Sequence, residues 1–160
     1  MDPIPLVFSV TSMIFSFIGA ILAFFTDFGW WNVGYSWSYY FFIGSEMAPA
    51  WAQFFLFLFG FLFLLLLLLS ILKLICSLGK LSDKIDKIVI FGGIGLSAVT
   101  FIYNLLLVGI FASFAAGDWW GMSTSFYDGL VGPIIIGIFF VVQLVYKNKG
   151  SKGKVSYNLH

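Results

Sequence analysis

The stretch WAQFFLFLFGFLFLLLLLLSILKLICSL, which covers Trp51–Leu78, decides the class of this chain. It contains the uninterrupted run Leu64–Leu69, and its single charge is Lys73. About 20 apolar residues are enough for a helix to cross the hydrocarbon core of a bilayer. The segment is apolar on all sides, which is typical of a helix that faces lipid. We therefore expect a transmembrane helix here, with Lys73 extending its ammonium group toward the headgroups.

The remainder of the chain has the same character. Of 160 residues, 61% are hydrophobic and only 9% are charged, too few to cover a water-soluble globule. Three more apolar segments are long enough to span, and Pro133 is placed in the first turn of the last one. The expected fold is all-α and integral to the membrane, a four-transmembrane-helix bundle. It forms a single domain over 1–147, with spans at about 5–25, 51–78, 88–115 and 130–146, followed by a basic tail over 148–160.

The lysines predict how the spans are oriented. All eight lie near the second-to-third connection or in the tail, while Asp2, Asp83 and Asp86 are the acids on that side. That side therefore carries a net charge of +5, whereas the loops over 26–50 and 116–129 carry four acidic residues and no lysine. Because lysine-rich segments stay in the cytoplasm, we expect both termini in the cytoplasm and both loops outside the cell membrane. The tail is expected to be disordered or to contact lipid headgroups.

The short connection between the second and third spans predicts a tight helical hairpin. Gly79 is typical of the residue that ends a helix, and Ser82 is suited to cap the next one. Asp83 and Lys87 are four residues apart and are expected to pair weakly.

The loop over 26–50 is rich in aromatic residues and cannot be a mobile polar loop. In Tyr35–Tyr39, aromatic residues alternate with serines at a period of two, the pattern of a strand with one buried and one wet face. A short β-hairpin is one interpretation. A re-entrant or interfacial helix over Ser38–Gly44 is the alternative.

The loop over 116–129 repeats part of this pattern, because an offset of 89 residues places Trp30-Trp31 on Trp119-Trp120. Duplication of a two-helix unit would explain the match. Tryptophans also gather at membrane interfaces without binding a partner, since an indole has an apolar body and a polar N–H. The alternative is that both loops pack into one outer cap that contacts another protein, through the candidate residues Trp30, Trp31, Tyr35, Trp37, Tyr39, Trp119, Trp120 and Phe126.

Within the spans, small residues at helical spacing indicate close helix contacts. Asn104 is expected to form an interhelical hydrogen bond, worth about 1 kcal/mol, rather than to line a pathway. The candidate packing residues are Ser12, Ser16, Gly19, Ala20, Gly93, Ser97 and Asn104.

The residues that usually perform chemistry are sparse. His160 is the single histidine and Cys76 the single cysteine, so no disulfide or thiolate metal cage can form within the chain. The carboxylates Asp27, Glu46, Asp118 and Asp128 show no metal-binding or acid–base spacing and are interpreted as topology-setting, solubilising charges. We expect no enzyme activity, cofactor or metal, and a net charge of +1 predicts no nucleic-acid partner.

Two short motifs resemble those of the claudin and peripheral myelin protein tetraspan superfamily. Gly34-Tyr35-Ser36-Trp37 is similar to the Gly-Leu-Trp motif of the first outer loop, and Ser125-Phe126-Tyr127 is similar to the aromatic entry of the fourth helix. The four spans, the larger first outer loop and the basic inner hairpin agree with this resemblance. It implies a non-enzymatic membrane scaffold whose outer loops bind other proteins.

The leading hypothesis is therefore a structural, assembly or adhesion-type scaffold that acts through its aromatic outer loops. The partners expected are the lipid bilayer and other membrane proteins or further copies of this chain. An accessory subunit of a larger membrane complex is the first alternative, because it needs the same surfaces. An oligomeric channel for small neutral molecules is the third hypothesis.

Overall fold

The structure, a computed structural model, describes residues 3–33, 37–115 and 119–156. It is mostly helical and confirms four helices that are long and apolar enough to cross a membrane. A small sheet accompanies them. The elements are α1 (Pro3–Phe25), β1 (Gly29–Val33), β2 (Trp37–Phe41), α2 (Ala50–Ser77), α3 (Asp83–Phe114), β3 (Trp119–Met122) and α4 (Thr124–Ser156).

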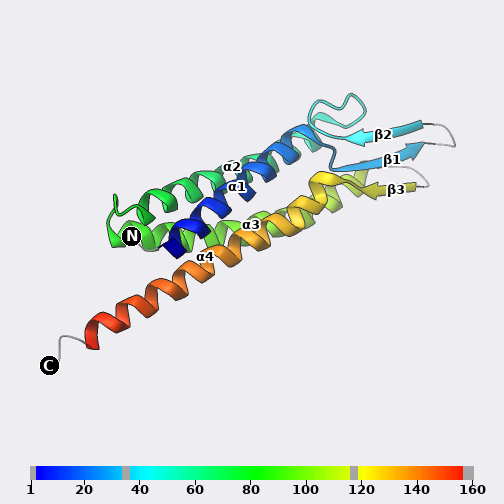
Figure 1. The fold of residues 1–160 in the computed structure, drawn as a ribbon. Helices are drawn as coiled ribbons and strands as arrows, with labels where there is room; N and C mark the ends of the chain where they lie inside the picture. Colours follow the sequence, from blue (N-terminus) through cyan, green and yellow to red (C-terminus); the bar gives the residue numbers. More distant parts are fainter. Residues whose placement is uncertain (1–2, 34–36, 116–118, 157–160) are drawn as a thin grey trace.

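The four helices run lengthwise beside one another, and the sheet caps one end of the bundle (Figure 1). Helix α1 packs against α2 and α4, and α3 packs against the same two helices. The beginning of α1 and the end of α4 both lie at the end opposite the sheet (Figure 1). The connections 26–49 and 115–123 therefore share one end, and the α2–α3 hairpin occupies the other.

The α2–α3 hairpin forms as the sequence predicts. Leu78 ends α2, and Gly79 follows with a φ of +72°, a left-handed conformation that glycine adopts without strain. Ser82 caps α3 by accepting a hydrogen bond from the backbone N–H of Ile85 at 3.5 Å. Asp83 pairs with Lys147 on α4, 3.3 Å away, and not with the expected Lys87.

Small residues bring the helices into close contact. A Cβ atom on Gly19 of α1 would overlap the ring of Phe63 on α2, and one on Gly93 of α3 would lie 2.5 Å from the ring of Phe140 on α4. The buried hydroxyl of Ser16 donates to the carbonyl oxygen of Ser12 at 2.8 Å. Serines can line apolar interfaces in this way because their own helix satisfies the donor.

A short antiparallel sheet forms at the capped end, in the order β2-β1-β3. In the central strand, Trp31 lies opposite Tyr39 of β2 and Trp120 of β3. The predicted β-hairpin in the first loop is thus confirmed, and a helix over Ser38–Gly44 is wrong. Residues 38 to 41 alternate between exposed and more buried positions with a period of two, which a helix cannot provide.

Helix α4 is longer at both ends than the predicted span. It begins at Thr124, so Pro133 lies in the helix interior and not in the first turn. The missing N–H leaves the carbonyl of Gly129 without its usual helical donor. The backbone stays helical through Ser156, so the expected disorder of the tail is wrong up to that residue. Lys147 is anchored by ion pairs to α3, and each further residue then adds a helical hydrogen bond at low cost.

Candidate functional site

The sheet has an inner face that is part of the hydrophobic core. Paired residues of neighbouring antiparallel strands point to the same side, which places Trp31, Tyr39 and Phe41 together on this face. The ring of Trp31 lies 6.0 Å from that of Phe111 on α3, and the ring of Phe41 lies 5.0 Å from that of Phe114. Aromatic packing of this kind fixes the sheet rigidly to the end of the bundle.

The opposite face of the sheet is turned away from the helices. Trp119 and Tyr40 are 71% and 48% exposed there. The indole of Trp30 covers Gly121 of β3 so closely that a Cβ atom on the glycine would lie 3.0 Å from it. We call this surface the exposed sheet face, and it consists of Trp30, Asn32, Ser38, Tyr40 and Trp119.

Backbone hydrogen bonds join the two loops into one unit. The N–H of Phe28 donates to the carbonyl of Phe41 at 2.7 Å, and the N–H of Ser123 donates to the carbonyl of Phe28 at 2.9 Å. The N–H of Ser125, in the first turn of α4, donates to the carbonyl of Asp27 at 3.2 Å. Residues from both connections therefore form a single cap.

One side chain of α2 holds the chain that follows β2. The Oε1 atom of Gln53 accepts from the N–H of Gly44 at 2.9 Å, and its Nε2 atom donates to the carbonyls of Ser45 and Ala48 at 2.6 and 2.9 Å. The hydroxyl of Ser45 donates to the carbonyl of Tyr40 at 2.7 Å. This network fixes the end of β2, and with it the position of Tyr40.

The candidate contact residues from the sequence divide into two groups. Trp30 and Trp119 belong to the exposed sheet face, and Trp120 is 45% exposed although its ring contacts Phe111. Three others point toward the core: Trp31 is only 4% exposed, Tyr39 packs on Trp31, and Phe126 packs on Phe28. Tyr35 lies outside the described residues, and Trp37 is described only through its backbone in β2.

The burial of Trp31 corrects its expected role, because a side chain inside the core cannot reach a partner. Tyr40, which is 48% exposed on the exposed sheet face, was not among the candidates from the sequence. The alternation of serine and aromatic residues along β2 carried the signal, since Tyr40 shares the face of the exposed Ser38.

The predicted packing residues lie at helix interfaces. The Nδ2 atom of Asn104 on α3 donates to the carbonyl of Phe126 on α4 at 3.2 Å. Asp128 is half-buried in the first turns of α4, so it is not the solubilising loop charge that the sequence suggested. The remaining members, Ser12, Ser16, Gly19, Ala20, Gly93 and Ser97, are all buried.

The opposite end of the bundle holds an ion-pair network that sequence patterns did not reveal. The ammonium of Lys73 on α2 lies 2.7 Å from a carboxylate oxygen of Asp86 on α3, and Lys147 on α4 lies 2.6 Å from the other oxygen. The side chain of Lys73 is only 4% exposed. The prediction that it extends toward headgroups is therefore wrong, because a buried carboxylate provides a nearer partner.

Among the described residues, no three histidine, cysteine or acidic side chains gather in a way that could hold a metal ion. No known family model matches this chain, and no curated protein is similar enough to count as a relative.

Proposed function

We propose that the four helices cross the cell membrane with the sheet outside and both termini in the cytoplasm. The support is the charge distribution at the two ends of the bundle. The end with the α2–α3 hairpin carries Lys73, Lys80, Lys84 and Lys87, and no lysine occurs in the connections at the sheet end. Positive charge near the ends of spans retains a segment in the cytoplasm.

Cysteine labelling of intact cells tests this orientation. In a Cys76→Ser background, Ser38→Cys on the exposed sheet face should react with an impermeant maleimide. Lys84→Cys on the hairpin should react only after the cells are permeabilised, because the bilayer shields it. The two positions are both exposed in the structure, so they are a matched pair. The reverse labelling pattern would contradict the proposed orientation.

We further propose that the protein is a non-enzymatic tetraspan scaffold that binds another membrane protein through the exposed sheet face. The observation that carries this proposal is the exposure of Trp119, at 71%, on the same rigid face as Tyr40 and Trp30. Rigid aromatic side chains lose little conformational entropy on binding, and tryptophan and tyrosine are enriched among residues that dominate interface energy.

Two further features favour a protein partner over simple anchoring at the lipid interface. The aromatic side chains come from two separate loops that hydrogen bonds hold at fixed spacing, which lipid anchoring does not require. Asn32 and Ser38 add polar groups between them, as at protein interfaces that combine aromatic anchors with hydrogen bonds. The resemblance to the claudin and peripheral myelin protein superfamily implies the same use of the outer loops.

The double variant Tyr40→Ala/Trp119→Ala should lose the partner when the protein is purified from native membranes in mild detergent. Loss of the two central contacts, at about 2 kcal/mol or more in total, corresponds to at least about a 30-fold drop in affinity. Thermal unfolding should be unchanged, because both side chains lie largely outside the core.

The matched control is Phe54→Ala, which removes an aromatic side chain that is 62% exposed on α2 and lies off the sheet. It should retain the partner at the wild-type level. Equal recovery of the partner with the double variant and with this control would exclude the exposed sheet face as the binding surface.

A further inference from the structure

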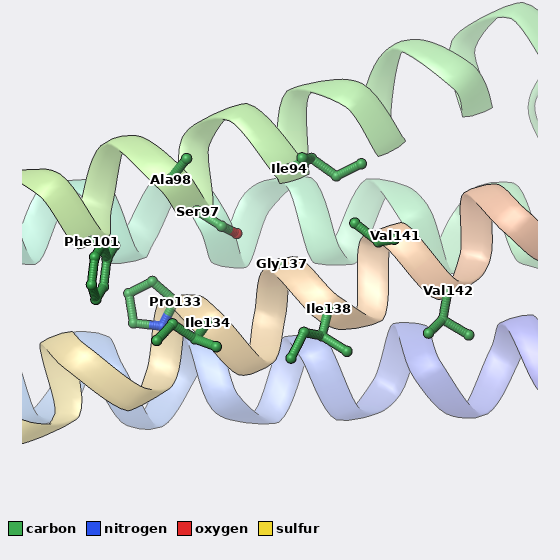
Figure 2. A pocket seen from close by; sticks show the side chains of 10 residues that line it. All are labelled: Ile94, Ser97, Ala98, Phe101, Pro133, Ile134, Gly137, Ile138, Val141 and Val142. Atoms are coloured by element: carbon green, nitrogen blue, oxygen red, sulfur yellow. The ribbon is translucent and has the colours of Figure 1, made fainter.

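An apolar groove runs between α3 and α4 on the side of the bundle. Ile94, Ala98 and Phe101 form the α3 wall, and Pro133, Ile134 and Ile138 form the α4 wall (Figure 2). The volume of the groove is about 360 Å³. It lies within the segments that we place in the bilayer, where hydrocarbon is the surrounding solvent.

Adjacent hollows, which share lining residues, follow one another from this groove toward the end of the bundle that carries the ion pairs. A second hollow of about 260 Å³ shares Val141 and Val142 with the groove and continues to Tyr146. A third hollow, also about 260 Å³, shares Tyr146 and is polar. We call the groove and the second hollow the α4 track, and the third hollow the polar cavity.

The polar cavity presents a hydrogen-bond donor that lacks an acceptor. Gln143 is only 3% exposed, and its Nε2 atom has no hydrogen-bond partner among the described residues. Its Oε1 atom lies 3.5 Å from the hydroxyl of Ser9, which also donates to the carbonyl of Pro5 at 2.7 Å. A buried amide donor normally has a partner, so an acceptor oxygen of a ligand would complete this site.

The charge at this end of the bundle favours an anion. Lys73 and Lys147 line the polar cavity together with Asp83 and Asp86, so the lining itself is neutral, and Asp86 has one oxygen paired with each lysine. Lys80, Lys84 and Lys87 lie exposed at the same end. With Asp83 and Asp86 as the acids, these five lysines leave a local charge of +3. Clusters of this kind next to a span attract anionic headgroups.

We propose that the chain binds one anionic glycerophospholipid, with its phosphate group at the polar cavity and an acyl chain along the α4 track. A phospholipid carries both the acceptor anion and the hydrocarbon that these linked hollows accommodate. The proposal rests on the membrane placement given above and is independent of the protein partner, which binds at the opposite end.

Native mass spectrometry of the detergent-purified protein tests the proposal, after incubation with equal amounts of phosphatidylglycerol and phosphatidylcholine. One phosphatidylglycerol should remain bound, with occupancy at least about tenfold above that of phosphatidylcholine, a difference of 1.4 kcal/mol. Ala98→Phe fills the groove from an exposed position and should lower this occupancy by a similar factor. Val99→Phe, at the next position and outside the groove, should behave like wild type.

Gln143→Leu provides a second variant, which removes the unpartnered donor at similar volume. It should reduce the preference for phosphatidylglycerol whether or not Ala98→Phe folds. Equal occupancy in Ala98→Phe and Val99→Phe, or equal binding of the two lipids by wild type, would overturn the proposal. Equal competition between inorganic phosphate and phosphatidylglycerol would also overturn the proposal, because it would indicate a site for the free anion. Loss of a dimer in Ala98→Phe without loss of lipid would overturn it too, because it would assign the groove to a second copy of the chain.

Discussion

Asp86→Ala is expected to destabilise the folded protein by about 3–5 kcal/mol, the cost of leaving a buried charge without its partner. Among the described residues, Asp86 is the single carboxylate that contacts Lys73, whose side chain is 4% exposed, and it also contacts Lys147. Without Asp86, the ammonium group of Lys73 keeps one side-chain hydrogen bond among the described residues, to the hydroxyl of Ser77 at 3.3 Å. Thermal and denaturant unfolding in detergent would measure the loss.

Asp83→Ala is the matched control on the same helix. Its side chain is 98% exposed and its distance to Lys147 is 3.3 Å, so the change should cost less than about 1 kcal/mol. A third variant separates charge from packing. In Lys73→Met/Asp86→Leu the buried lysine and its partly exposed partner are both replaced by apolar groups, and most of the stability should return. Similar losses for Asp86→Ala and Asp83→Ala would show that Lys73 is not buried as described.

Gly93→Val is expected to disrupt the contact between α3 and α4. A Cβ atom at this position would lie 2.5 Å from the ring of Phe140, and that ring is fully buried. Because the neighbouring helices hold the ring, the two helices must separate, and overpacking of this kind costs about 1–3 kcal/mol or more. The measured result should be a lower unfolding temperature in detergent.

Gly95→Val, two residues further along α3, controls for the change in helix propensity. A Cβ atom there would have no described atom within 4 Å other than those of its own helix and chain neighbours. We expect it to be neutral within about 0.5 kcal/mol. If Gly95→Val is as harmful as Gly93→Val, the effect comes from the helix backbone and not from the α3–α4 contact.

The helices, the α2–α3 hairpin and the β-hairpin could be predicted from the sequence because each depends on local patterns. Apolar runs of 17 or more residues identify the spans, Gly79 and Ser82 mark the turn between α2 and α3, and the alternation around Ser38 indicates a strand. The sequence also suggested that the two aromatic loops pack together, and in the structure β1 and β3 pair.

The predictions that were wrong concern features that depend on contacts between distant segments of the chain. Lys73 and Asp86 are near in sequence, but burial of their pair depends on Lys147, 61 residues after Asp86. Likewise, Trp31 and Trp30 have the same chemistry, and only the packing of β1 against Phe111 decides which of the two is buried. An interior Pro133 could not be predicted, because the start of α4 is set by contacts with Asp27 in the other loop.

The mass of the intact particle, extracted from native membranes in mild detergent, tests whether the exposed sheet face binds a partner. We expect a wild-type particle that contains a further membrane protein, and a Tyr40→Ala/Trp119→Ala particle that contains this chain and lipid but lacks that protein. A particle of unchanged mass and protein content in the double variant would contradict the claim that the exposed sheet face binds a partner.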